Sequence, residues 1–229
     1  METPRCEAPT SSLPPAPCPP APVDLYPPLL AWREAHHWLE RRRLEQLVRR
    51  RFAAEHGARI GHFLPRLFGL WHANRPLAAV GMGAAARGPM FQEHYLDDSA
   101  ETFLSRHLGQ ATSRDEIAEI GNLASQRPGL QRSLYLHLVE QLAAEGIAWL
   151  LFTATPEVHN GIRRLGLKLH PLMPADPARL GAGQAEWGRY YDRHPWVMAG
   201  DLRRAHRDLI DHGLLPLARP AEVTDAQLA

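Results

Sequence analysis

The fold is decided by the stretch from Ile117 to Ala154, which begins Ile-Ala-Glu-Ile-Gly-Asn-Leu-Ala-Ser and ends Ile-Ala-Trp-Leu-Leu-Phe-Thr-Ala. Side chains of a strand alternate between its two faces, so the first four residues predict a strand with Ile117 and Glu119 on one side. Gly121 and Asn122 interrupt this alternation as a β-bulge would. A bulge bends a strand and re-aims its side chains, often beside an active site.

A helix and a second strand follow. Leucines recur at every fourth position from Leu130 to Leu142, which predicts a helix with one apolar face. Gly146 stands just beyond it, where a left-handed residue commonly ends a helix. The apolar run 147–152 is typical of a strand that is covered on both faces. The order strand, glycine turn, helix, strand predicts a βαβ unit.

The turn before this helix is a candidate anion site. The backbone N–H groups of Gly129, Leu130, Gln131 and Arg132 have no acceptor within the helix. These groups and the positive end of the helix dipole together favour an anionic ligand, typically a phosphate.

Composition limits the function classes. The formal net charge of the 229 residues is +1, which does not indicate nucleic-acid binding. Lys168 is the only lysine, which we read as the codon bias of a GC-rich bacterial genome. Both cysteines, Cys6 and Cys18, lie in a proline-rich head, so neither a disulfide framework nor a zinc site is expected. The chain shows neither a spanning segment nor a signal peptide, and a cytoplasmic protein is expected.

We expect one mixed α/β domain from residue 29 to 215, with flanking tails. Residues 1–28 are rich in Pro and Ala and predict a disordered segment, either a tether or a proline-rich ligand for a partner. Residues 216–229 are expected to be a flexible tail. A helix is predicted over 29–56, with its arginines around the side opposite the apolar face. This pattern is typical of a docked helix, and also of one lying on an anionic membrane.

Shorter patterns predict the remaining elements. Strands over 63–72 and 77–86 form a hairpin, and Asp98 with Glu101 has the spacing of a helix-capping pair, with Leu104 and His107 on the buried side of that helix. A short helix over 156–166, a strand over 167–172 and a helix over 201–212 complete the domain.

Several separate motifs resemble one family. They are Gln92-Glu-His-Tyr-Leu-Asp97 with Glu101, Glu119-Ile-Gly-Asn-Leu-Ala-Ser125, Phe152-Thr-Ala154, Trp187-Gly-Arg-Tyr-Tyr191 and Val197-Met-Ala-Gly200. In this order they resemble the thermostable haemolysin family of bacterial proteins, over roughly residues 50–200. That family is similar to the GCN5-related N-acyltransferase fold and to acyl-homoserine-lactone synthases. It usually has a glutamine at the place of His94.

The resemblance implies a phosphopantetheine site at the glycine turn, filled by acyl-CoA or an acyl carrier protein as co-substrate. Gln126 and Gly129 fit the phosphate loop of acyltransferases, whereas Gln131 replaces its second small residue. Ile162 stands where many acyltransferases have a tyrosine that protonates the leaving thiolate. The expected cofactor-binding residues are Leu123, Ala124, Ser125, Gln126, Gly129, Leu130, Gln131, Arg132 and Asn160.

Glu119 and Asn122 are the candidate catalytic residues. Glu119 can accept the proton of an acceptor amine, or it can be a carboxylate paired with an arginine. Asn122 can orient the acyl carbonyl, or it can merely tolerate the left-handed backbone of a bulge. The candidate substrate-binding residues are Glu93, Tyr95, Asp97, Glu101 and Tyr190, for which helix capping and core packing are the alternatives. No histidine shows the paired spacing of a metal site, and no metal is expected.

These features predict an N-acyltransferase that moves an acyl group, including a fatty one, from a pantetheine thioester to a small amine. Two alternatives come from other classes: a protein that lyses membranes, directly or through an acylated product, and a non-catalytic acyl-binding relative. The sequence itself offers no support for membrane contact.

Overall fold

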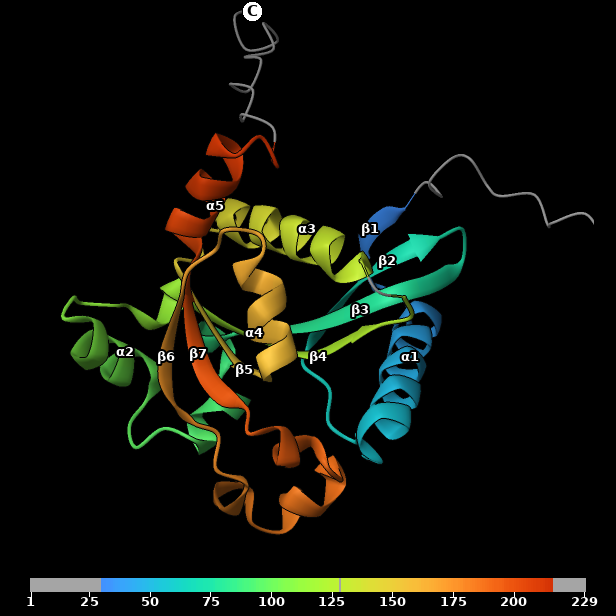
Figure 1. Ribbon diagram of the computed structural model, residues 1–229, viewed down its shortest axis with the longest axis horizontal. Coiled ribbons are helices and arrows are strands. Elements are labelled where there is room, and N and C mark those ends of the chain that lie inside the picture. The colour runs from blue at the N-terminus through green and yellow to red at the C-terminus, as the bar shows by residue number, and fades with distance from the viewer. Residues whose placement is uncertain (1–29, 128, 216–229) are drawn as a thin grey trace, which may run out of the picture.

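The computed structural model describes residues 30–127 and 129–215, and the expected tails 1–28 and 216–229 lie outside this range. Within these described residues, seven strands form one sheet in the order β1-β2-β3-β4-β5-β7-β6 (Figure 1). The strands are β1 (Ala31–Glu34), β2 (Arg66–His72), β3 (Arg75–Ala84), β4 (Ile117–Ser125), β5 (Trp149–Ala154), β6 (Leu169–Pro174) and β7 (Trp196–Asp201). All neighbouring strands run antiparallel except β4 and β5, which are parallel.

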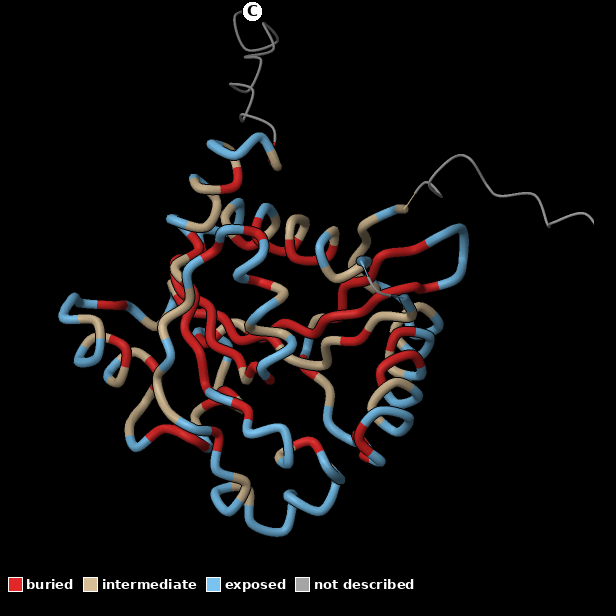
Figure 2. The backbone as a smooth tube through the Cα atoms, in the orientation of Figure 1, coloured by how far each residue is buried: buried red, intermediate tan, exposed pale blue. Residues whose placement is uncertain are grey.

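In the part of the chain that the structure describes, five α-helices and several 3-10 turns flank the sheet. The helices are α1 (Trp38–His56), α2 (Ala100–Leu108), α3 (Leu130–Ala144), α4 (Pro156–Arg163) and α5 (Leu202–Asp211). The 3-10 segments are η1 (Ala85–Arg87), η2 (Phe91–His94), η3 (Arg114–Glu116), η4 (Pro177–Trp187) and η5 (Tyr190–Arg193). One face of the sheet packs against α3, α4 and α5, and the other against α1 and α2. The five inner strands are accordingly buried along most of their length, whereas the edge strands β1 and β6 are only partly covered (Figure 2).

The expected βαβ unit is present as β4, α3 and β5. The leucines at 134, 138 and 142 are buried, so the four-residue period does mark the inner face of α3. Gly129 and Gly146, at either end of the helix, have φ angles of +91° and +78°. Glycine adopts this left-handed region without steric cost.

β4 and β5 separate after a short paired region. Residues 117–119 of β4 pair with 149–151 of β5, and beyond them β4 pairs only with β3. The register of β3 and β4 shifts between Ala79 and Gly81, opposite Asn122, whose φ is +51°. The predicted bulge is therefore confirmed. It bends β4 away from β5 and opens the sheet on one side.

The prediction of a helix beginning at Leu29 was wrong. Residues 31–34 instead form the edge strand β1, where Trp32 stacks on Phe68 of β2 and on His137 of α3. The helix begins at Trp38, which is 68% exposed, so it does not share the buried face of Leu44 and Val48. The Trp32 ring packs against both β2 and α3. This tertiary packing stabilises the strand more than the local sequence pattern stabilises a helix, because packing often outweighs intrinsic propensity.

Smaller expectations also need correction. The first hairpin strand begins at Arg66 rather than Phe63, and β6 begins at Leu169 rather than Leu167. Helix α2 is preceded by Ser99, whereas Asp98 pairs with Arg106, so the expected capping pair does not form. On the same helix His107 is exposed, whereas Ala100 and Leu104 are buried in the core. No helix in the described part of the chain is long and apolar enough to cross a membrane.

Candidate functional site

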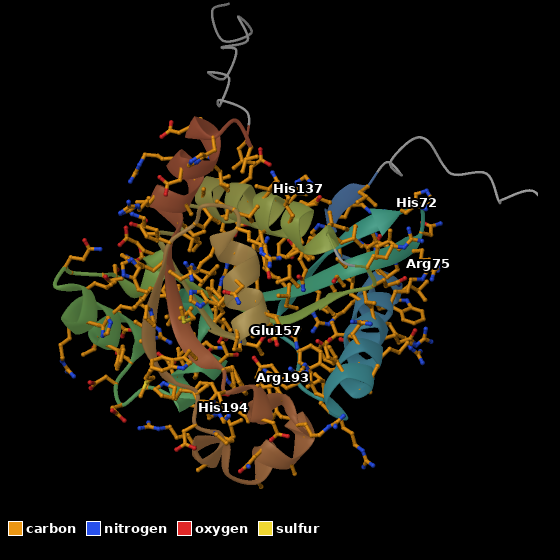
Figure 3. The ribbon with its side chains drawn as sticks, viewed as in Figure 1. His72, Arg75, His137, Glu157, Arg193 and His194 are labelled. Carbon is orange, nitrogen blue, oxygen red and sulfur yellow. The ribbon has the colours of Figure 1, made fainter. Side chains whose placement is uncertain are left out.

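A cavity of about 1030 Å³ opens where β4 leaves β5. Its floor is the bulged half of β4, from Glu119 to Ser125, together with Gln126 just after the strand. The end of α1, the turn η2 and the η4–η5 segment form its walls. At its rim Arg193 of η5 donates to Glu157 of α4 at 3.3 Å, and Figure 3 shows this pair between α4 and the η4–η5 segment.

The cavity brings together part of the expected cofactor-binding set. Leu123, Ala124, Ser125, Gln126 and Gln131 line it, and so do both candidate catalytic residues. Gly129, Leu130, Arg132 and Asn160 are not part of its lining. The expected carrier site therefore extends from the cavity past its edge to the first turn of α3.

The end of β4 directs backbone donors into the opened side. The Gln126 N–H donates to Leu77 O of β3 at 2.8 Å. Alternate residues of a strand turn their N–H groups to opposite sides, so the Ser125 N–H points away from β3. Beyond Glu119, β5 no longer pairs with β4 on that side. The free backbone groups of this half of β4 can therefore form hydrogen bonds with a ligand, as they would with a neighbouring strand.

Glu119 lies under η2 with its side chain engaged at both oxygens. Phe91 N–H donates to Oε1 and Gln92 N–H donates to Oε2, each at 3.0 Å. The residue is only 3% exposed, and this burial raises the pKa of the Glu119 carboxyl, with the two N–H donors opposing the rise. No arginine pairs with it in the described residues.

Asn122 uses its side chain to hold another part of the chain. Leu64 N–H donates to Oδ1 at 3.0 Å, and Nδ2 donates to His62 O at 3.2 Å. These bonds fix the segment before β2 against the bulge. The side-chain amide is thus committed to this segment, and Asn122 also accommodates the left-handed backbone of the bulge.

Aromatic rings form much of the wall opposite β4. The ring of Phe91 lies 5.3 Å from His94, 5.6 Å from Trp187 and 6.3 Å from His62. Tyr190 lies 5.3 Å from Trp187, and its hydroxyl donates to Thr153 of β5 at 3.3 Å. Of the expected substrate-binding residues, Tyr190 lines the cavity, and burial raises its pKa to about 12.

The other four expected substrate-binding residues lie outside the cavity lining. Arg114 of η3 bridges Glu93 and Glu101, and the N–H groups of Met90 and Ala100 also donate to Glu93. Burial opposes ionisation of Glu93, but these donors outweigh it and lower the pKa to about 2. Tyr95 shares a hydrogen bond with the Tyr191 hydroxyl, and Asp97 pairs with Arg179. These residues anchor η2 and α2 rather than form the pocket.

Sequence reasoning missed His56, His62, Phe91 and Thr153, which all line the cavity. His56 packs edge-on against Tyr190 at 5.3 Å, and burial lowers the pKa of its imidazole. Two of them carried a usable signal: Thr153 lies within the motif at 152–154, and Phe91 immediately precedes the motif at 92–97. Among the described residues no cluster of three or more His, Cys, Asp or Glu side chains could hold a metal ion.

The fold is shared with acyl-transferring synthases of known structure. FeeM, an N-acyl amino acid synthase from uncultured soil microbes, is 16% identical with a TM-score of 0.59, covering 82% of this chain and 99% of its own. The acyl-homoserine-lactone synthase LasI is 12% identical with a TM-score of 0.56, covering 83% and 98%. The CoA-dependent synthase BjaI, solved with SAM and isopentyl-CoA, is 14% identical with a TM-score of 0.54, covering 82% and 91%.

These similarities establish the fold as that of the GCN5-related acyltransferases, as expected from the motifs. A search of curated proteins finds no significant match. A family model, described as thermostable hemolysin, matches residues 34–206, which is most of the chain. The protein therefore belongs to the thermostable hemolysin family.

Proposed function

We propose that this protein is an N-acyltransferase that moves an acyl group from a pantetheine thioester to an amine. The observation that carries the proposal is the opening of β4 from β5 onto a large, aromatic-lined cavity with Glu119 in its floor. The carrier is acyl-CoA or an acyl carrier protein, and both present the same phosphopantetheine arm.

The carrier arm has a complementary surface along β4. An extended chain with amide groups can bond to an unpaired strand edge as an added strand does. The Ser125 N–H faces that edge, and the N–H groups at the start of α3 follow a few residues later. A phosphate at the end of the arm is stabilised by those N–H groups and by the helix dipole.

The acyl chain has an apolar wall available. Phe52, Ile60, Leu64, Leu123 and Trp187 line the same cavity. Each buried methylene of a ligand contributes about 0.8 kcal/mol when it leaves water, so a long chain gains more than an acetyl group. This supports a fatty acyl group as the cargo.

In the reaction, the amine nitrogen attacks the thioester carbon and the electron pair moves to the carbonyl oxygen. Collapse of this adduct breaks the C–S bond, and the sulfur departs as thiolate and takes up a proton. Backbone N–H donors beside the carbonyl contribute about 3 kcal/mol each when they stabilise such an oxyanion. Glu119 lies in the floor of the same cavity, where its buried carboxylate holds the turn η2 beside the reacting groups.

Two structural relatives support this reaction class by what their names state. FeeM is an N-acyl amino acid synthase, and BjaI is a CoA-dependent acyl-homoserine-lactone synthase. Both products require transfer of an acyl group onto an amine nitrogen.

The test is release of free thiol from a panel of acyl-CoAs and acylated carrier proteins, offered with a panel of amines. We expect thiol release that depends on the amine, together with a product whose mass is the amine plus the acyl group. Thioester binding without turnover would indicate an acyl-binding protein. Neither binding nor turnover on any pair would refute the proposal.

A further inference from the structure

The turn η2 is held on the cavity wall by the buried carboxylate beneath it. Glu119 accepts the N–H groups of Phe91 and Gln92, which are the first two residues of the turn. His94 is the last residue of the same turn and lines the cavity. Because Glu119 holds the start of so short a turn, it also places His94.

The orientation of the His94 ring follows from its hydrogen bond. Nδ1 lies 2.9 Å from Phe91 O, and a carbonyl oxygen can only accept. Nδ1 therefore carries the hydrogen, and in the neutral ring Nε2 keeps its lone pair. A fixed tautomer with a free Nε2 is the form in which a histidine accepts a proton from a substrate.

Glu119 and His94 differ in their freedom to react. Both Glu119 oxygens already accept a backbone N–H, and the side chain is almost fully buried. His94 is solvent-exposed, and no side chain in the described part of the structure bonds to its ring. The ring can therefore approach an amine in the cavity without breaking a contact that holds η2.

The charged and titratable groups around His94 come from three elements. Glu119 of β4 is close enough to His94 for the charge of His94 to lower the pKa of the Glu119 carboxyl, against the rise caused by burial. His62, from the segment before β2, stacks on Phe91. Glu93, the neighbour of His94 in η2, pairs with Arg114, which also pairs with Glu101. The negative charge of Glu119 stabilises a positive charge on His94.

We propose that His94 is a further catalytic residue, whose Nε2 accepts the proton of the attacking amine while the Glu119 carboxylate positions η2 and stabilises the imidazolium. The N–C bond forms, the C–S bond breaks, and the amine proton moves to Nε2. The imidazolium then returns the proton to solvent, from which the thiolate sulfur is protonated. This inference rests on the proposed acyl transfer and adds the identity of its base.

The test compares His94→Gln and His94→Ala with the wild-type enzyme. We expect His94→Gln to lower kcat by about 10² to 10⁴, the usual contribution of a general base, with little change in KM for the thioester. The acidic limb of the kcat/KM pH profile should move or disappear. Added imidazole should restore part of the activity of His94→Ala, since the emptied position opens on the cavity.

A matched control is His72→Gln, at the exposed tip of the β2–β3 hairpin and away from the cavity (Figure 3). It should leave kcat within about twofold of the wild type. Unchanged kcat and pH profile in His94→Gln would overturn the assignment of the base, and so would a loss in His94→Ala that imidazole never restores. Absence of turnover in the wild type would instead refute the acyl transfer itself.

Discussion

At the residue scale, the two candidate catalytic residues of β4 have separate tasks although they are three positions apart. Glu119 points to η2, and Asn122 points to the segment before β2. The bulge changes the direction of the strand. The side chains of these two nearby residues therefore bond to different walls of one cavity.

Glu119→Gln should lower kcat by about 10²-fold or more while the affinity for the thioester stays nearly unchanged. The amide NH2 group would face a backbone N–H at Phe91 or Gln92 and would disturb the turn that places His94, and the negative charge that stabilises the imidazolium would be lost. Steady-state kinetics and calorimetric titration measure the two quantities. Glu140→Gln, on the exposed side of α3, is the control. Equal losses of affinity and rate would show that Glu119 serves only the fold.

Glu93 should make the protein sensitive to acid. Its pKa in the folded state is about 2 against an ordinary value of 4.5, so its stabilising contribution is present above about pH 4.5 and is lost as the pH falls through about 2. The full contribution of Glu93 to the free energy of unfolding is ~3 kcal/mol at most. The midpoint of denaturant unfolding should be measured at steps of about one pH unit from pH 6 to pH 2. As the pH falls, this midpoint should decrease less steeply in Glu93→Gln than in the wild type. Parallel curves for the two proteins would contradict this reading.

At the scale of elements, the bulge is the feature that opens the sheet. Gly81 of β3 faces it, and a Cβ at that position would lie 2.6 Å from Asn122 Oδ1 and 3.0 Å from Leu64 Cβ. Only glycine permits β3 to approach this closely. The bulge therefore depends on residues of two strands and of the segment before β2.

Replacing Asn122 should separate its two structural contributions. Asn122→Gly keeps the left-handed backbone but loses the bonds to Leu64 and His62, and we expect a loss of about 1–3 kcal/mol in the free energy of unfolding. Asn122→Ala adds the cost of φ +51°, a further ~1–2 kcal/mol. Urea unfolding measures both. Identical stabilities of the two variants would show that the backbone angle contributes nothing.

At the scale of the whole molecule, the cavity is closed by segments far apart in the chain. Arg59 N–H donates to Glu186 O at 2.6 Å, and Arg189 N–H donates to His56 O at 2.8 Å. These bonds join the end of α1 to the η4–η5 segment. Gly188 lies at this junction with φ +53°, and a Cβ there would lie 2.3 Å from His56 O.

Gly188→Ala should displace the η4–η5 segment from α1, because the methyl group clashes with backbone that cannot rotate away. We expect faster hydrogen exchange at the amides of Arg59 and Arg189 and weaker binding of long-chain thioesters. Gly183→Ala, where a Cβ meets no atom within 4 Å, is the matched control in the same segment. Unchanged exchange in Gly188→Ala would contradict the role of this junction.

The β4–α3–β5 unit, its glycine turn and the bulge at Asn122 were predictable from the amino-acid sequence. These features follow from local rules: side-chain alternation, a four-residue leucine period and backbone angles that glycine and asparagine tolerate. Tertiary structure alone decided that Trp32 lies on an edge strand, that Arg114 joins Glu93 to Glu101, and that His62 and Trp187 share a wall with Phe91. Most of these contacts join residues 20 or more positions apart, and many pairings satisfy the same hydrophobic pattern, so only packing of the whole chain selects among them.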